Sequence, residues 1–279
     1  MLRTIGDFGL EINDVCLPAI YCIPMSTAIV KIYTPEGFVL AADGYGSDGR
    51  TEAQKVFEIK SEVGALACCL SNRAEISDPK TGVNIQFDSV CNLVANDPRL
   101  RNTTDLHGYA DIFSRAFGKH VQEQVHKAKE QGLFDSKEKR ILKKDWTTDL
   151  HFAGYFRGTP SITVSKVRFH GAKLSVLHSC HPNLKYFTGT FYGSEKVLQA
   201  LKDGDARFAQ YASPVFGIPR TVSIADAIDA AAKYIEACSS PEGRKFDPDY
   251  CNCIGGRIRF AKITPSGGFE WIERLRENP

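Results

Sequence analysis

The chain has 279 residues, which suffice for one large domain or two of ordinary size. Its composition is that of a globular protein, with 43% hydrophobic and 24% charged residues and a formal net charge of +2. A charge so close to zero argues against a nucleic-acid binder that depends on phosphate contacts. No run of about 18 apolar residues occurs, so no membrane-spanning helix is expected. The nine scattered cysteines favour reduced thiols and a cytoplasmic location over a disulfide framework.

The first clear element is a pair of short strands. Residues Thr27 to Tyr33 are rich in β-formers, and Phe38 to Ala42 form a short apolar run. Between them, Pro35 and Gly37 supply turn chemistry. In an antiparallel hairpin the start of the first strand lies beside the end of the second. Thr27 and Asp43, which follows the second strand, are therefore predicted to be neighbours.

A loop rich in Gly, Asp and Ser then leads to Lys55, which begins another strand, VFEI. A hydroxyl, a carboxylate and an ammonium thus stand at the ends of three consecutive strands. Taken singly each has an ordinary interpretation, since Asp often forms turns and Lys before a strand is usually exposed. Their combination makes Thr27, Asp43 and Lys55 the candidate catalytic residues.

The remaining pattern alternates strands with helices. A long helix is predicted from about Tyr109 to Gln131, and Ser223 with Asp226 indicates a capping box that opens a further helix. The other expected strands are GALACCL at 64–70, Leu150 to Phe156, Ile162 to Phe169, Lys173 to Leu177, and a final hairpin that turns at Pro265 to Gly268. Two stacked, mostly antiparallel sheets with helices on both outer faces would bury the apolar faces of all these strands and helices. We therefore predict an α+β fold, a four-layer αββα sandwich.

The segment from Thr27 to Asp43, TAIVKIYTPEGFVLAAD, resembles the proteasome family of N-terminal nucleophile hydrolases without a gap. KVFEI, beginning at Lys55, is similar to that family's next strand, and a weaker likeness continues nearly to the C-terminus. The resemblance implies the same αββα fold for residues 27–279 as one domain. It implies that residues 1–26 are a propeptide or an N-terminal extension.

The resemblance also implies a mechanism that needs no metal or organic cofactor. Cleavage before Thr27 would give one residue both the hydroxyl nucleophile and the α-amino base, with Lys55 and Asp43 in support. Ser26 is a second candidate nucleophile, ranked below Thr27. The implied activity is that of a threonine-type peptidase acting on peptides or unfolded proteins. A homo-oligomeric ring and a regulatory ATPase are the implied partners.

The sequence departs from the family before the final Gly255-Gly256. Active members carry an Asp and a Ser there, where this chain has Cys251 and Ile254. The departure leaves two alternatives open: a non-catalytic subunit that serves as a scaffold or binding module, and, ranked last, an amidase acting on a small molecule. Cys251 and Cys253 form a C-x-C pair, but no second pair stands at zinc-site spacing, so a metal site is not expected.

Overall fold

The computed structural model describes residues 27–45, 51–59, 61–71, 75–78, 83–86, 90, 94, 97–130, 146–170, 173–217 and 221–273. The predicted N-terminal extension, residues 1–26, and the candidate nucleophile Ser26 lie outside the described residues.

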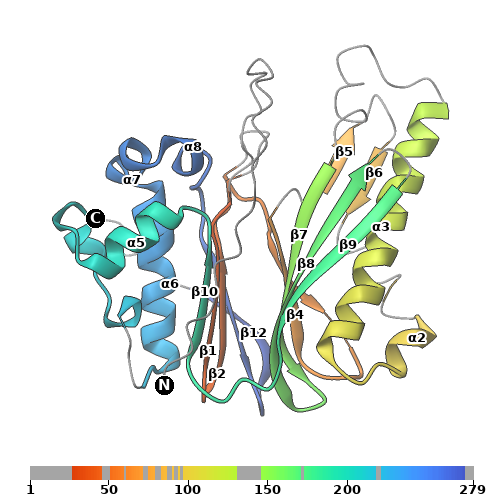
Figure 1. Cartoon of the computed structure of the whole chain (residues 1–279), viewed down its shortest axis with the longest axis horizontal. Coiled ribbons are helices and arrows are strands. Elements are labelled where there is room, and N and C mark those ends of the chain that lie inside the picture. Colours follow the sequence, from red (N-terminus) through yellow and green to blue (C-terminus); the bar gives the residue numbers. More distant parts are fainter. Residues whose placement is uncertain are drawn as a thin grey trace, which may run out of the picture.

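Two antiparallel sheets of five strands face each other (Figure 1). The first sheet has the strand order β10 (Thr188–Tyr192), β1 (Ile29–Thr34), β2 (Gly37–Ala42), β11 (Arg259–Thr264) and β12 (Gly268–Ile272). The second has the order β3 (Val56–Ile59), β4 (Leu66–Leu70), β7 (Trp146–Phe156), β8 (Thr159–His170) and β9 (Lys173–His181). The smaller elements are β5 (Glu75–Asp78), β6 (Val83–Gln86), α2 (Pro98–Arg101), α7 (Pro241–Phe246), α8 (Pro248–Cys251) and two 3₁₀ turns, Ala206–Tyr211 and Pro214–Phe216.

The predicted hairpin is present as β1 and β2, with Ile29 paired to Ala42 and Thr34 paired to Gly37. On its open sides it is flanked by β10, which pairs with β1, and by β11, which pairs with β2. The pairing of β11 with β2 brings the segment before Arg259 to the end of β2. Residues more than 200 positions apart in sequence therefore meet at the end of the sheet where Thr27 lies.

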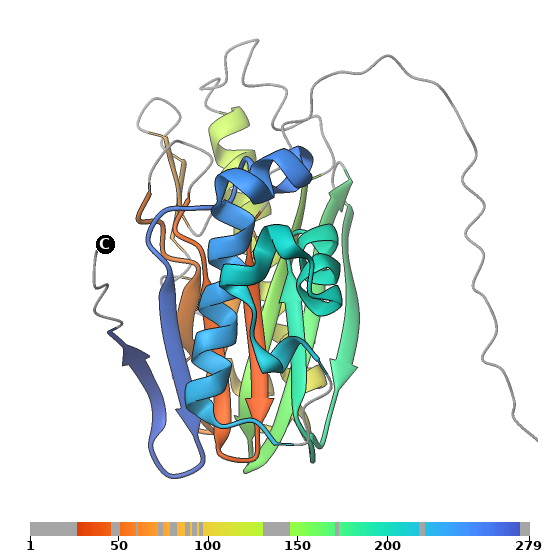
Figure 2. The same ribbon diagram turned by 90° about the vertical axis from the view of Figure 1, so that its left-hand side faces the viewer.

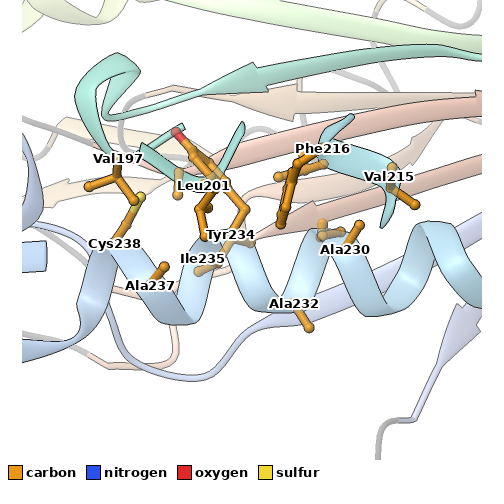
Figure 3. Close-up of a cluster of buried hydrophobic side chains, with 14 of the residues drawn as sticks. Val197, Leu201, Val215, Phe216, Ala230, Ala232, Tyr234, Ile235, Ala237 and Cys238 are labelled. Atoms are coloured by element: carbon orange, nitrogen blue, oxygen red, sulfur yellow. The ribbon is translucent and has the colours of Figure 1, made fainter. Parts of the chain in front are cut away.

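Helix α3 (Leu106–Glu130) covers the outer face of the second sheet (Figure 1). The prediction of a long helix in this part of the chain is confirmed, and its residues Phe113, Phe117 and Val121 are buried against that sheet. Helices α5 (Glu195–Asp203) and α6 (Ile224–Ser239) lie on the outer side of the first sheet (Figure 2). Val197 and Leu201 of α5 lie over the face of α6 that carries Cys238 and Tyr234 (Figure 3).

Apolar side chains pack between α3 and the second sheet and between α6 and the first sheet. A third apolar layer lies between the two sheets themselves. It includes Ile29 and Leu40 from the first sheet and Ala153 and Ile162 from the second. The fold is thus a mixed α and β structure with two antiparallel sheets, helices on their outer sides and apolar side chains between them. No helix in the described part of the chain is long and apolar enough to cross a membrane.

The capping box that the sequence predicts at Ser223 is present at the start of α6. Ser223 Oγ accepts from the Asp226 N–H at 3.1 Å, and Asp226 Oδ2 accepts from the Ser223 N–H at 3.1 Å. The substitution Ser223→Ala should lower the free energy of unfolding by about 1 kcal/mol, because one of the first N–H groups of α6 loses its acceptor. Urea denaturation measures this change. Ser239→Ala at the other end of α6 is the control and should change stability by less than about 0.5 kcal/mol.

Candidate active site

The three residues singled out from the sequence meet at one end of the facing sheets. Lys55 Nζ donates to Thr27 Oγ1 at 2.5 Å and to Asp43 Oδ1 at 2.8 Å. Thr27 precedes β1, Asp43 follows β2 and Lys55 precedes β3, so each side chain is positioned by the end of a strand. All three are buried, with exposed fractions of 4% for Thr27, 0% for Asp43 and 5% for Lys55. The ammonium therefore links the hydroxyl to the carboxylate.

The carboxylate of Asp43 is fixed by backbone donors as well as by Lys55. Oδ1 accepts from the Ala28 N–H at 2.9 Å, and Oδ2 accepts from the N–H groups of Tyr45 and Gly255, both at 3.2 Å. These donors come from the start of β1, the loop after β2 and the segment before β11. Such a carboxylate has little freedom to turn, so it holds the Lys55 ammonium at a fixed distance from Thr27.

Two glycines allow the segments around Asp43 to approach each other closely. A side-chain carbon on Gly256, where φ is +72°, would lie 2.3 Å from the carbonyl oxygen of Thr51. A side-chain carbon on Gly44 would lie 2.5 Å from the carbonyl oxygen of Arg257. Gly44 N–H also donates to the carbonyl oxygen of Gly255 at 3.0 Å. Only a residue without a side chain fits either position, so the Gly255-Gly256 pair is part of the scaffold that holds Asp43.

Burial and charge act in opposite directions on the Asp43–Lys55 pair. Burial lowers the pKa of Lys55, and the charge of Asp43 opposes that shift. Burial raises the pKa of Asp43, while Lys55 and the N–H groups of Gly255 and Ala28 oppose that shift. A lysine whose pKa is lowered binds its proton less tightly than one in water. Lys55 is thus placed to donate to, or exchange a proton with, the Thr27 hydroxyl.

At the two positions where the resemblance implies helper residues, this chain has the buried residues Cys251 and Ile254. Cys251 and Ile254 are buried in the cluster between the first sheet and α6. The structure contains a different hydroxyl–carboxylate pair nearby, since Ser194 Oγ donates to Asp247 Oδ2 at 2.5 Å and both residues are buried. Ser194 follows Gly193, where an added side-chain carbon would lie 3.5 Å from the Thr27 carbonyl oxygen.

Sequence reasoning missed this pair, although a signal for each member was present. Ser194 stands directly before a helical pattern and caps α5 by accepting from the Val197 N–H at 3.1 Å. Asp247 lies directly before Pro248. It is four residues before Cys251, the position at which the resemblance implies a carboxylate. Ser194 and Asp247 support the chain segment beside Thr27, whose hydroxyl bonds to Lys55.

A second polar group lies between the sheets, next to the candidate site. Lys31 of β1 is 1% exposed, and its Nζ lies 3.0 Å from Nδ1 of His151 in β7. Burial lowers the pKa of Lys31 from 10.5 to about 8, a shift that Cys69, Cys68 and Asp149 oppose. Burial, followed by the charge of Lys31, lowers the pKa of His151 well below its usual value. The sequence signal was a lysine within the otherwise apolar strand IVKIYT.

The buried ammonium of Lys31 predicts a distinct dependence of stability on pH. Below pH 8 both the folded and the unfolded protein carry the charge, so the full cost of burying it is present. As pH rises from 8 towards 10.5 the folded protein loses the proton first, so the free energy of unfolding rises. Relative to the variant Lys31→Met, the free energy of unfolding of the wild type should rise by up to about 3 kcal/mol over this interval.

Chemical denaturation of both proteins at about pH 7.5 and about pH 10 measures this gain. Groups other than Lys31 titrate in both proteins and cancel in the difference. The control is Lys233→Met, which removes a partly exposed lysine paired to Asp229 at 2.9 Å and is measured at the same two pH values. A constant difference between wild type and Lys31→Met would mean that the pKa of Lys31 is the same in the folded and the unfolded protein, so that burial does not lower it.

None of the cysteines within the described ranges forms a disulfide; they are Cys68, Cys69, Cys180, Cys238, Cys251 and Cys253. Within the described ranges, no group of three or more His, Cys, Asp or Glu side chains has the arrangement of a metal site. Cys253 lies close enough to Lys55 to influence its pKa, so the C-x-C segment belongs to the surroundings of the candidate site.

Comparisons with known proteins give a coarse likeness to solved structures. No family model matches the chain, and no curated protein matches it. Among solved structures the chain is similar to Anbu (ancestral beta-subunit) from Yersinia bercovieri, with 12% sequence identity and a TM-score of 0.47. That similarity covers 88% of this chain and 87% of the other.

Proposed function

We propose that the protein is a threonine-type peptidase with Thr27 as its nucleophile. The observation that carries the proposal is the position of Lys55 Nζ, which bonds to Thr27 Oγ1 at 2.5 Å and to Asp43 Oδ1 at 2.8 Å. A Thr hydroxyl is a weak nucleophile near neutral pH and needs a base and a nearby positive charge. A buried ammonium held by a fixed carboxylate supplies that charge where solvent does not weaken it.

The chemistry begins with cleavage of the bond between Ser26 and Thr27, which frees the α-amino group of Thr27. An α-amino group has a pKa of about 7.7–8.0 and takes the hydroxyl proton as Oγ1 attacks the substrate carbonyl carbon. The Lys55 ammonium stabilises the developing oxyanion character of Oγ1. The proton then passes to the leaving amine, and an ester between the substrate acyl group and Thr27 Oγ1 remains. Attack by water on that ester releases the acid and restores the hydroxyl.

The proposal extends to fold, substrate and assembly. The facing sheets with helices outside them fit the αββα sandwich of the N-terminal nucleophile hydrolases, with residues 27–279 as one domain. The substrates we propose are peptides or unfolded proteins in the cytoplasm. A homo-oligomeric ring would restrict access to the site, and a regulatory ATPase remains a prediction from the resemblance.

A non-catalytic subunit is the second candidate, and one observation favours it. Cys251 and Ile254 stand where helper residues are expected, and both are buried among apolar side chains. If Ser194 and Asp247 do not take the place of those helper residues, the site would keep its geometry but would not hydrolyse a substrate. The chain would then serve as a scaffold or binding module.

The test is the mass of the purified full-length protein together with its N-terminal sequence. Thr27 should become the first residue, and a threonine-directed electrophile should add once, at Thr27. The substitution Thr27→Ala should retain residues 1–26 and lose the label. Thr188→Ala, which changes a threonine at the far end of the strand paired with β1, is the control and should be cut and labelled as the wild type is. A wild-type protein that keeps Met1 and takes no label would favour the non-catalytic subunit.

A further inference from the structure

A set of polar side chains, which we term the Asp149 cluster, lies at the same end of the molecule as Thr27. It consists of Lys31, Ser71, Asp149, His151 and Tyr192. Two hydrogen bonds join Ser71 to Asp149. The Ser71 N–H donates to the carbonyl oxygen of Asp149 at 3.0 Å, and the Asp149 N–H donates to Ser71 Oγ at 2.8 Å. The Tyr192 side chain, from the other sheet, lies close enough to Asp149 and Ser71 for both to influence the pKa of its hydroxyl.

Two short connections tie this cluster to the candidate catalytic residues. Tyr192 pairs with Ile29, two residues after Thr27, and Gly193 lies against Thr27. On the opposite sheet, the Leu70 N–H donates to the carbonyl oxygen of Lys55 at 2.9 Å, directly before Ser71. Tyr192 and Ser71 of the cluster are therefore joined through neighbouring backbone segments to Thr27 and Lys55.

Two atoms of the cluster have no hydrogen-bond partner among the described residues. They are Oδ1 of Asp149 and Nε2 of His151, in side chains that are 6% and 2% exposed. Buried polar atoms usually have partners, because an unpaired one costs about 1–3 kcal/mol. The two residues stand two apart on β7, so both side chains lie on the face turned towards the first sheet. A ligand group that bonds to both atoms would remove that cost.

The bond between Lys31 and His151 decides which kind of group His151 offers. An ammonium has only donors, so Nδ1 of His151 accepts from Lys31 Nζ. A neutral imidazole then carries its proton on Nε2, which is a donor. Asp149 Oδ1, in contrast, is an acceptor when ionised. The cluster thus presents one free donor and one free acceptor on the same face of β7.

The surrounding charges disfavour a charged ligand. Lys166, Arg168 and Lys31 all lie near enough to Asp149 to lower its pKa, against the larger effect of burial. A cationic side chain would meet these three positive charges, and a carboxylate would meet Asp149 itself. An apolar side chain would leave both free atoms unpaired. A primary carboxamide is neutral, donates through its NH₂ and accepts through its carbonyl oxygen.

We propose that the Asp149 cluster is the specificity subsite of this enzyme, and that it selects a carboxamide side chain, glutamine above all, next to the cleaved bond. The inference rests on the proposed peptidase function. It assigns Asp149 and His151 to substrate selection, with Lys31 fixing the tautomer of His151 and Tyr192 bridging the two sheets beside Thr27.

The test uses the processed full-length protein and peptides that differ only in the residue before the cleaved bond: Gln, Leu, Lys or Glu. We expect kcat/KM for the Gln peptide to exceed that for each of the others by at least about tenfold, since a site built to bond polar groups rejects ligands that leave them unpaired. In Asp149→Ala the ratio of Gln to Leu should fall at least about tenfold. The rate at which a small electrophile labels Thr27 should stay within about threefold, because that reaction does not use the subsite.

Asp111→Ala is the matched control, since it removes a carboxylate that bonds to His178 on the other face of the second sheet, beneath α3. Its ratio of kcat/KM for the Gln peptide to that for the Leu peptide should equal the ratio of the wild type. If Asp149→Ala does not fold, Tyr192→Phe gives the second variant, because it removes the hydroxyl that lies near Asp149 and Ser71 while keeping the ring. Its ratio of kcat/KM for the Gln peptide to that for the Leu peptide should fall as well.

The outcomes separate the two proposals. A wild type that labels at Thr27 and cleaves peptides without preferring Gln overturns the subsite and leaves the peptidase standing. A ratio unchanged in both variants, as expected if an ordered water alone occupies the two atoms, also overturns it. A wild type that neither labels at Thr27 nor cleaves any of the peptides overturns the peptidase, and the subsite with it.

Discussion

Replacing Lys55 by Met should slow acylation of Thr27 by about 10²–10³-fold or more, the usual effect of removing one group that stabilises developing charge. It should also lower the free energy of unfolding by about 3 kcal/mol, because Asp43 would remain buried without its counter-ion. Asp43 keeps its bonds from the N–H groups of Ala28, Tyr45 and Gly255, so the fold should survive. Loss of activity in a folded protein is thus the expected combination.

Labelling by a threonine-directed electrophile gives the rate, and urea denaturation gives the stability. The matched control is Lys262→Met, which removes a lysine from a pair with Glu270 on the last hairpin, at 3.0 Å. A pair that is partly exposed contributes little, so the control should change stability by less than about 1 kcal/mol and leave the rate unaltered. Normal labelling of Lys55→Met would show that the ammonium has no part in activating Thr27.

The substitution Gly256→Ala should have the largest effect among changes that add a single methyl group near the site. At φ +72° any other residue is strained, and the added carbon would lie 2.3 Å from the backbone oxygen of Thr51. Backbone strain and steric overlap together should lower the free energy of unfolding by about 3 kcal/mol or more. Because the neighbouring Gly255 N–H bonds to Asp43, the shift should also reduce labelling of Thr27.

Gly204→Ala separates strain from overlap. Gly204 ends α5 with φ +69°, close to the value at Gly256, but no atom lies within 4 Å of an added carbon. This control should lose about 1 kcal/mol from the backbone conformation alone and keep full labelling. Equal losses in the two variants, measured by urea denaturation, would mean that the approach of Gly256 to Thr51 contributes nothing.

The candidate site could be predicted from the sequence because its three residues lie in one short segment. A hairpin turn fixes its own register, so the positions of Thr27 and Asp43 followed from the length of the loop between the strands. Lys55 begins the next strand of the chain. The long helix and the capping box at Ser223 were also local patterns, and the structure has both.

The contacts between distant segments could not be predicted in the same way. Lys31 and His151 are 120 residues apart and meet only because β1 and β7 face each other across the two sheets. A lysine in the largely apolar strand IVKIYT is a local signal, but it does not show which face of the sheet Lys31 occupies or that His151 is its partner. Strand β10 was missed for a related reason, because its partner β1 lies about 160 residues earlier.

The donors to Asp43 have a consequence for the timing of maturation. The bond from Gly255 spans 212 residues and depends on the pairing of β11 with β2. Under the proposed function, a nascent chain still on the ribosome without its final hairpin lacks one of the groups that hold the carboxylate. Self-cleavage before Thr27 would then be reserved for chains whose synthesis and folding are complete, which protects the cell from a premature protease.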